Sequence, residues 1–120
     1  MAAEKQFETK IKRYLDSKGC WYVKFFANRN TKVGVPDILA CCGGVFVGIE
    51  VKGPCGRPSE LQLYNCRRIN KAGGVAAVVW PDDFDRLKSV IDTLCAGGGR
   101  QSVAHLVFAD QYLHAVPAQV

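Results

Sequence analysis

Apolar positions near the start of the chain follow the period of a helix. Over 4–18 the apolar residues recur at steps of three and four, with lysines and an arginine between them, and Gly19 follows as a helix stop. The β-branched and aromatic run 20–26 predicts a strand, and the polar, basic stretch after it predicts a loop ending before Pro36. The chain is therefore expected to begin with an amphipathic helix and a strand.

Two mainly apolar runs then flank a glycine pair. Strands are predicted over 37–42 and 45–52, with Gly43 and Gly44 forming the turn between them. If these glycines are the two central residues of a tight primed turn, the strands form a hairpin of fixed register. Counting outward along that hairpin, Asp37 lies directly opposite Glu50.

The second half of the chain predicts a helix, a strand and a further helix. Ser59 is expected to cap a helix that ends before the glycines at 73–74, and the continuous apolar run 75–80 predicts an interior strand. Pro81 opens a final helix with an apolar face. Residues 97–120 show no clear period. A short strand or helix is expected around 103–108, in a tail without an assigned function.

The order of these elements, αβββαβα, predicts an α/β fold in which helices flank a central mixed sheet. The second helix is long enough to connect the strands 45–52 and 75–80 in parallel, whereas the hairpin pairs its strands antiparallel. A chain of 120 residues fits one domain. We expect that domain to span 1–96, with 97–120 as a separate tail.

Composition favours a soluble intracellular protein with an anionic partner. Apolar residues make up 48% of the chain and charged residues 22%, and no run of eighteen apolar residues or secretory segment is present. The formal net charge is +5, and residues 1–71 hold 13 Lys and Arg against 6 Asp and Glu. This basic portion suggests nucleic acid, although a solvated basic surface would have the same composition.

The six cysteines indicate neither a zinc site nor a disulfide framework. No C-x-x-C pair occurs, and the neighbours Cys41 and Cys42 would point to opposite faces of a strand. Reduced thiols in a reducing compartment are the simpler interpretation. The same geometry argues against a thiol redox protein built on this pair.

The hairpin carries the candidate chemistry. Like charges directly opposite each other destabilise a sheet, so Asp37 and Glu50 need a cation between them. Lys52 projects from the same face as Glu50, but one ammonium cannot neutralise two carboxylates and a phosphate. A divalent cation such as Mg²⁺ would resolve the repulsion and would bind phosphate esters. The alternative is that these residues form an ordinary exposed strand face and the end of a loop.

Pro36-Asp37, followed after twelve residues by Glu50-Val51-Lys52, resembles the PD-(D/E)XK nuclease signature. Over roughly 4–95, the segments "ETKIKRYLDSKG", "GVPDILACCGGVFVGIEVKG" and "GRPSELQLYNCRRINKAGGVAAVV" together resemble the virus-type replication-repair nuclease (VRR-NUC) family and, more distantly, the archaeal Holliday junction resolvases. The resemblance implies a restriction-endonuclease-like core and Mg²⁺-dependent cleavage of DNA, with Mn²⁺ as a possible substitute.

The resemblance also implies roles for individual residues. Asp37, Glu50 and the main-chain carbonyl of Val51 would be metal ligands, and Lys52 the catalytic lysine. The metal-site glutamate of the first helix would be Glu8, and Glu4, one helical turn earlier on much the same face, is the rival assignment. The family has a glutamine on the second helix that lies beside the active site, and Gln62 matches it. The alternative is that Gln62 is an ordinary exposed helix residue.

Backbone-directed binding of branched DNA is expected, because no base-reading element is present. The candidate phosphate contacts are Lys10, Lys12, Arg13, Lys24, Arg29 and Lys32. Stand-alone members of the resembled family, similar to phage-encoded proteins, imply a cytoplasmic homodimeric resolvase whose two active sites cut opposite strands of a four-way junction. Monomeric cleavage of flaps and a non-catalytic DNA-binding module are the alternatives.

Four aromatic and histidine side chains stay outside the expected site. Trp21 and Trp80 belong to predicted strands and are expected in the core, although Trp21 at a strand start could reach DNA or a dimer partner. His105 and His114 lie in the tail, outside the resemblance. They are expected to be ordinary surface or core histidines.

Overall fold

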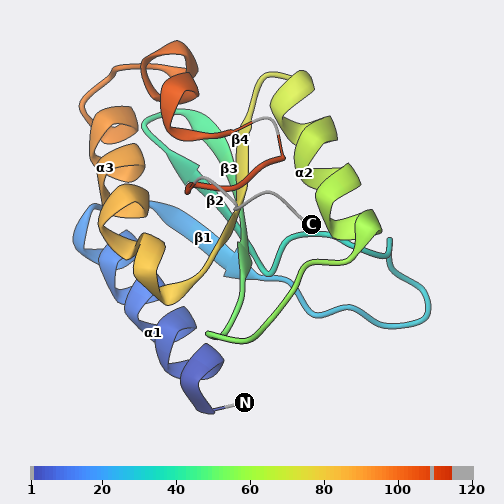
Figure 1. Cartoon of the computed structure of the whole chain (residues 1–120). Helices are drawn as coiled ribbons and strands as arrows, with labels where there is room; N and C mark the ends of the chain where they lie inside the picture. The colour runs from blue at the N-terminus through green and yellow to red at the C-terminus, as the bar shows by residue number, and fades with distance from the viewer. Residues whose placement is uncertain (1, 109, 115–120) are drawn as a thin grey trace.

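The computed structural model describes residues 2–108 and 110–114 (Figure 1). In chain order the elements are α1 (Ala2–Ser17), β1 (Trp21–Lys24), β2 (Ile38–Cys42), β3 (Val45–Val51), α2 (Glu60–Lys71), β4 (Val75–Val79), the 3-10 turn η1 (Pro81–Asp83), α3 (Phe84–Cys95) and the 3-10 helix η2 (Arg100–Leu106). The expected order αβββαβα is confirmed, and 3-10 segments are added before and after α3.

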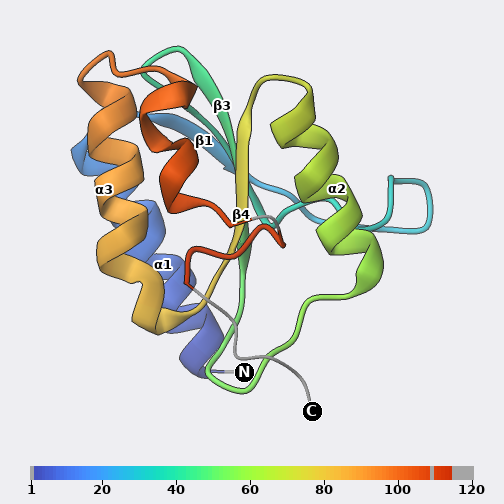
Figure 2. The same ribbon diagram turned by 45° about the horizontal axis from the view of Figure 1, so that its top comes forward.

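A mixed sheet forms the middle layer of the fold. Its strand order is β1-β2-β3-β4, with antiparallel pairing up to β3 and parallel pairing between β3 and β4. Helices α1 and α3 cover one face, and α2 lies on the other (Figures 1 and 2). Since α2 connects β3 to β4, it crosses over between the two parallel strands as the sequence predicts.

The hairpin has the expected register. Cys42 pairs with Val45 and Ile38 with Ile49, across a turn in which Gly43 and Gly44 have φ of +56° and +81°. Glycine adopts these values without a steric penalty. Gly43 also lies against α3: a Cβ at this position would be 1.9 Å from the carbonyl oxygen of Leu94.

Side-chain alternation divides the core between the two faces. The larger cluster lies between the sheet and the helices α1 and α3, and it includes Val47, Ile49 and Val51 of β3. The smaller cluster lies under α2 and includes Cys66, Ala76 and Val78, with Trp80 and Tyr112 packed against it. Consequently the even-numbered residues of β3, including Glu50, face α2.

Helix α2 covers only part of its face of the sheet. It packs on β4 and β3. Within the described chain, no helix covers β1 and β2 on this same side of the sheet. Trp21 is therefore 68% exposed, so the expectation that it belongs to the core is wrong. Tyr64 of α2 is 44% exposed as well, because the buried residues of this helix are Asn65 and Cys66.

The segment after α3 packs on the same core as the rest of the chain. Val103 of η2 and Leu113 are each 1% exposed and belong to the larger cluster. Residue Tyr112 forms an isolated parallel bridge with Val78 of β4. Of the short strand or helix expected around 103–108, the structure shows a helix, the 3-10 helix η2, which spans Arg100–Leu106. Among the described residues, no helix has the length and apolarity needed to cross a membrane.

Candidate active site

Asp37 and Glu50 meet at one end of the hairpin. Asp37 directly precedes β2, and the register that pairs Ile38 with Ile49 continues to bring Asp37 opposite Glu50. One carboxylate oxygen of Asp37, Oδ2, accepts a hydrogen bond of 2.9 Å from the main-chain N–H of Val51. The structure thus brings together the two acids that the sequence predicts to lie side by side.

Glu50 is a buried acid with an incomplete set of partners. It is 2% exposed, and its Oε2 lies 3.2 Å from the Nζ of Lys52. Its other oxygen, Oε1, is buried and accepts no hydrogen bond from the described residues, and the carboxyl group of Asp37 is the acid that lies beside Glu50. Burial, together with the neighbouring charge of Asp37, raises the pKa of Glu50 to about 7 despite the opposing effect of Lys52.

A lysine of β1 lies between Asp37 and a third carboxylate, that of Glu8. Lys24 Nζ is 2.7 Å from Oε1 of Glu8 and 3.6 Å from Oδ1 of Asp37. Lys12, one helical turn after Glu8 on α1, also forms an ion pair with Glu8, with 2.9 Å between Nζ and Oε2. Burial would raise the pKa of Glu8, but the hydrogen bonds from Lys24 and Lys12 outweigh it and hold that pKa below its ordinary value.

Both candidate glutamates of the first helix border the site. Glu8 reaches the Asp37 side of the site through Lys24, whereas Glu4 accepts a hydrogen bond of 3.2 Å from the main-chain N–H of Gly53. They therefore flank the ends of β2 and β3 from one helix. Glu8 is the acid that shares a cation with a predicted metal ligand.

Gln62 is engaged in capping α2. The main-chain N–H of Gln62 donates to Ser59 Oγ at 3.1 Å, and the side-chain Oε1 of Gln62 accepts from the main-chain N–H of Ser59 at 2.9 Å. Together these two bonds form a capping box. The N-cap predicted at Ser59 is confirmed. The geometry gives Gln62 a structural partner, and its catalytic role stays a prediction from the family resemblance.

The six predicted phosphate contacts fall into two groups. Lys12 and Lys24 are held by carboxylates of the site, so sequence analysis missed their position among the acids. The remaining four are exposed, and Lys10 lies 5.7 Å from the centre of the Phe84 ring. Arg29 and Lys32 belong to the β1–β2 loop, which extends past α2 in both ribbon views (Figures 1 and 2).

The donor set of this site fits a hard divalent cation. Residues 2–108 and 110–114 contain no cluster of three or more His, Cys, Asp and Glu side chains that could hold a metal ion. Two carboxylates, from Asp37 and Glu50, and the carbonyl of Val51 are however the oxygen ligands that Mg²⁺ takes together with water. The unpartnered Oε1 of buried Glu50 is the observation that favours such a cation.

Comparison with known families gives one match that covers more than half of the chain. A family model described as archaeal Holliday junction resolvase (hjc) matches residues 2–71. The matched segment runs from α1 to the end of α2 and contains Glu8, Asp37, Glu50 and Lys52. Neither the curated proteins nor the solved structures yielded a match.

Proposed function

The chain belongs to the archaeal Holliday junction resolvase (hjc) family, and we propose that it cleaves four-way junctions with Mg²⁺ bound by Asp37 and Glu50. The buried, unpartnered Oε1 of Glu50, opposite Asp37 and beside Lys52, is the observation that carries the proposal. Without a cation, this carboxylate would keep one oxygen unsatisfied in the protein interior.

In this proposal Asp37, Glu50 and the carbonyl of Val51 hold the metal, and Mn²⁺ can replace Mg²⁺. A divalent cation held there would supply Lewis-acid chemistry, which polarises a scissile phosphate and activates a water. Lys52, fixed by its ion pair with Glu50, orients that water or the phosphate from the α2 side of the sheet. Glu8 supports the opposite side through Lys24, which already lies close to Asp37.

The charge distribution supports binding through the DNA backbone. Arg13, Arg29 and Lys32 are exposed, and the last two lie on the loop that leads from β1 into Asp37. Cations at these positions can hold phosphates on either side of the scissile bond, so binding should weaken as salt is added. Recognition by backbone and shape is the mode that suits a junction without a fixed sequence.

An exposed apolar face supports a homodimer. Trp21, Cys41 and Phe46 lie in one row across β1, β2 and β3, and Trp21 and Phe46 are 68% and 46% exposed. Val23, on the same face of β1, is 38% exposed. A second copy packed here would bury these side chains and provide the second active site that symmetric cleavage requires. By contrast, the apolar face of α3 is already buried in the core.

We also propose that, among the nucleases of the PD-(D/E)XK superfamily, the chain is related to the VRR-NUC group. This proposal rests on the resemblance of the segment "GRPSELQLYNCRRINKAGG", with its glutamine early in α2 and its glycine pair before β4. The capping box at Ser59 and Gln62 gives this segment a structural reason for its serine and glutamine.

Cleavage of defined DNA structures tests the proposal. Purified protein is incubated with end-labelled four-way junction, flap and linear duplex, each with Mg²⁺, with Mn²⁺ and with EDTA. We expect paired nicks near the branch point that disappear with EDTA and in the Asp37→Asn and Lys52→Ala variants. Asp85→Asn is the matched control, because its side chain is 97% exposed and lies on α3. Cleavage of flaps alone would refute the resolvase, and junction binding without cleavage would refute the nuclease.

A further inference from the structure

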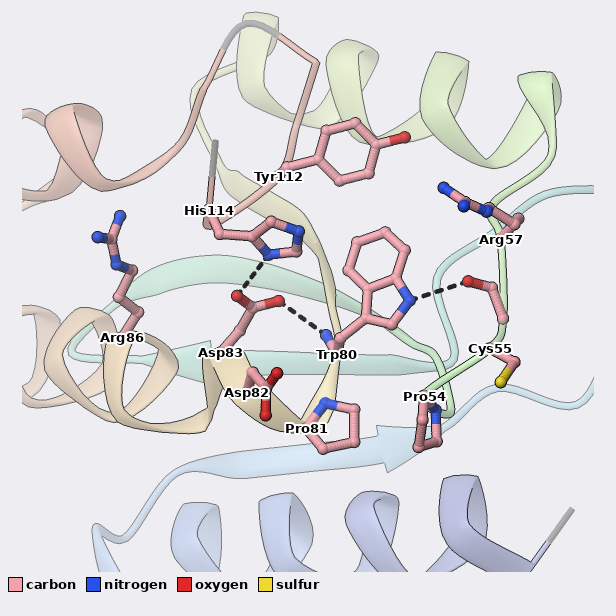
Figure 3. Close-up of a pocket in the computed structure, with 11 residues that line it drawn as sticks. Pro54, Cys55, Arg57, Trp80, Pro81, Asp82, Asp83, Arg86, Tyr112 and His114 are labelled. Atoms are coloured by element: carbon pink, nitrogen blue, oxygen red, sulfur yellow. Dashed lines mark hydrogen bonds and ion pairs between the residues drawn. The ribbon is translucent and has the colours of Figure 1, made fainter. Parts of the chain in front are cut away.

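A pocket lies beside the strand ends that carry the candidate catalytic residues. The pocket encloses about 620 Å³ and is formed where the loop after β3, the η1 turn and the segment around 112–114 meet (Figure 3). This volume falls within the range of small-molecule sites, which is about 300 to 1,000 Å³. Nothing in the catalytic scheme above uses these residues.

Three aromatic rings form one wall of the pocket. The centre of the Trp80 ring is 5.3 Å from that of Tyr112 and 5.2 Å from that of His114. The indole is held in place from its edge, because its Nε1 donates a 2.9 Å hydrogen bond to the carbonyl of Gly56. Trp80 and Tyr112 already touch, so a planar ligand would lie on the open face of this wall and not between the rings.

Asp82, Asp83 and Arg86 lie at one end of the pocket and Arg57 at the other (Figure 3), and Arg86 is already engaged, since its Nη1 donates a 2.9 Å hydrogen bond to the carbonyl of Leu113. Asp83 is buried, and both of its carboxylate oxygens already have partners. Oδ2 accepts a 2.9 Å hydrogen bond from the main-chain N–H of Trp80, and Oδ1 lies 2.6 Å from Nδ1 of His114. Arg57 lies across the indole from Asp82 and Asp83 (Figure 3). It is exposed and has no hydrogen bond or ion pair with the described residues. The Arg57 end therefore offers a guanidinium to an anionic group.

The pocket and the catalytic residues share a strand end and a loop. Val51 pairs with Val79, and the Lys52 N–H donates to the Val79 carbonyl at 2.9 Å, so Trp80 is the next residue beside Lys52 on the face that α2 covers. The loop between them is in contact with both. A Cβ on Gly56 would lie 3.3 Å from Cδ of Lys52, while the Gly56 carbonyl binds the indole.

A rigid aromatic wall with a cation at one end is complementary to a nucleotide, in which a planar base is attached to an anionic phosphate. From this geometry we propose that the pocket binds an unpaired nucleobase of the junction strand next to the scissile phosphate. The base stacks on Trp80 and Tyr112, and its neighbouring phosphate binds Arg57. This inference rests on the proposed function for its source of bases, because the branch point of a junction supplies bases freed from stacking on one side.

The fluorescence of Trp80 reports the binding of a base directly. The variant Trp21→Phe removes the exposed tryptophan and leaves Trp80 as the one indole of the chain. It is titrated in EDTA, so that cleavage plays no part, with a four-way junction carrying one unpaired adenine at the branch, with linear duplex, and with free dAMP. We expect saturable quenching by the junction, at most weak quenching by dAMP at millimolar concentration, and none by linear duplex.

A second variant tests the phosphate contact without disturbing the fold. Arg57→Ala, made in the Trp21→Phe background, is expected to bind the junction about ten-fold more weakly and to lose the quenching, since one stacked base with its contacts changes affinity by roughly one to two orders of magnitude. Arg67→Ala is the matched control, an exposed arginine on α2 outside the pocket, and should match its parent.

Each contrary result overturns one specific statement. Junction binding is measured independently by fluorescence anisotropy. If the junction binds but Trp80 is not quenched, or if Arg57→Ala has no effect, the aromatic wall only anchors the chain around 112–114. Tight quenching by dAMP that equals that of the junction would assign the pocket to free nucleotides. Absence of junction binding by the wild type as well as by every variant would refute the proposed function, and quenching of Trp80 by dAMP would then still show whether the pocket binds a base.

Discussion

Replacing Glu50 by glutamine should stabilise the metal-free protein at alkaline pH and abolish its activity. Glu50 is 2% exposed, and burial with the nearby charge of Asp37 raises its pKa from 4.5 to about 7. The ionised form is therefore disfavoured in the folded state. Glu50→Gln keeps the shape of the side chain and stays neutral, so it removes this penalty together with the charge that the proposed metal site requires.

The sign and size of the effect follow from linkage. Between pH 4.5 and about 7 the folded protein retains a proton on Glu50 that the unfolded chain has lost, so stability falls as pH rises through this window. One pKa unit corresponds to 1.36 kcal/mol, which gives a loss of about 3 kcal/mol above the folded pKa. Glu50→Gln lacks this fall. Its free energy of unfolding should exceed that of the wild type by about 3 kcal/mol at pH 8 and should equal it at pH 4.

Thermal unfolding in EDTA across pH 4 to 9 measures this difference. About 3 kcal/mol corresponds to a rise in Tm of roughly 10 °C for a domain of this size. At pH 8, Mg²⁺ should raise the Tm of the wild type by binding the folded state and leave that of Glu50→Gln unchanged. Asp85→Asn, an exposed carboxylate, serves as the control. Equal Tm values of wild type and Glu50→Gln at pH 8, or a difference independent of pH, would refute the reasoning.

Three other changes have defined outcomes. Lys24→Gln removes the ammonium shared by Glu8 and Asp37, so it should lower the Tm in EDTA. Because Asp37 then has no competing cation, Mg²⁺ should raise the Tm of this variant more than that of the wild type; an equal rise would contradict this. Gly43→Ala should lower the Tm much more than Gly44→Ala, because both glycines have positive φ but only the Cβ at 43 would collide with α3, at 1.9 Å from the Leu94 oxygen. Ser59→Ala should cost about 1 kcal/mol in denaturant unfolding and Ser59→Thr less, because the threonine hydroxyl can also cap the helix; equal losses would show that the cap contributes nothing.

The hairpin was predictable because local chemistry determines its register. Two glycines at the turn and alternating apolar residues allow one pairing, and that pairing places Asp37 opposite Glu50. Helix ends were also predictable, since Gly19 and Ser59 act through the backbone within a few residues of their own position. These features require no knowledge of how distant elements pack.

The exposure of Trp21 and the position of Lys24 were not predictable, because both depend on which elements cover the sheet. Alternation along β1 separates Trp21 from Lys24 but does not say which face a helix will cover. Lys24 looks like a phosphate contact in the sequence, and only the docking of α1 brings Glu8 within 2.7 Å of it. Trp80 and His114 are 34 positions apart in the sequence numbering, and the chain must fold back along β4 to bring their rings together.

Resolution of a cruciform in a supercoiled plasmid tests the central claim most directly. Two coordinated cuts across the four-way junction convert the plasmid to its linear form, whereas a single cut produces a nicked circle. With Mg²⁺ the wild type should give linear product, and EDTA or the Asp37→Asn variant should abolish it. Linear product formed equally well in EDTA, or by Asp37→Asn, would contradict a metal-dependent resolvase that acts through Asp37 and Glu50.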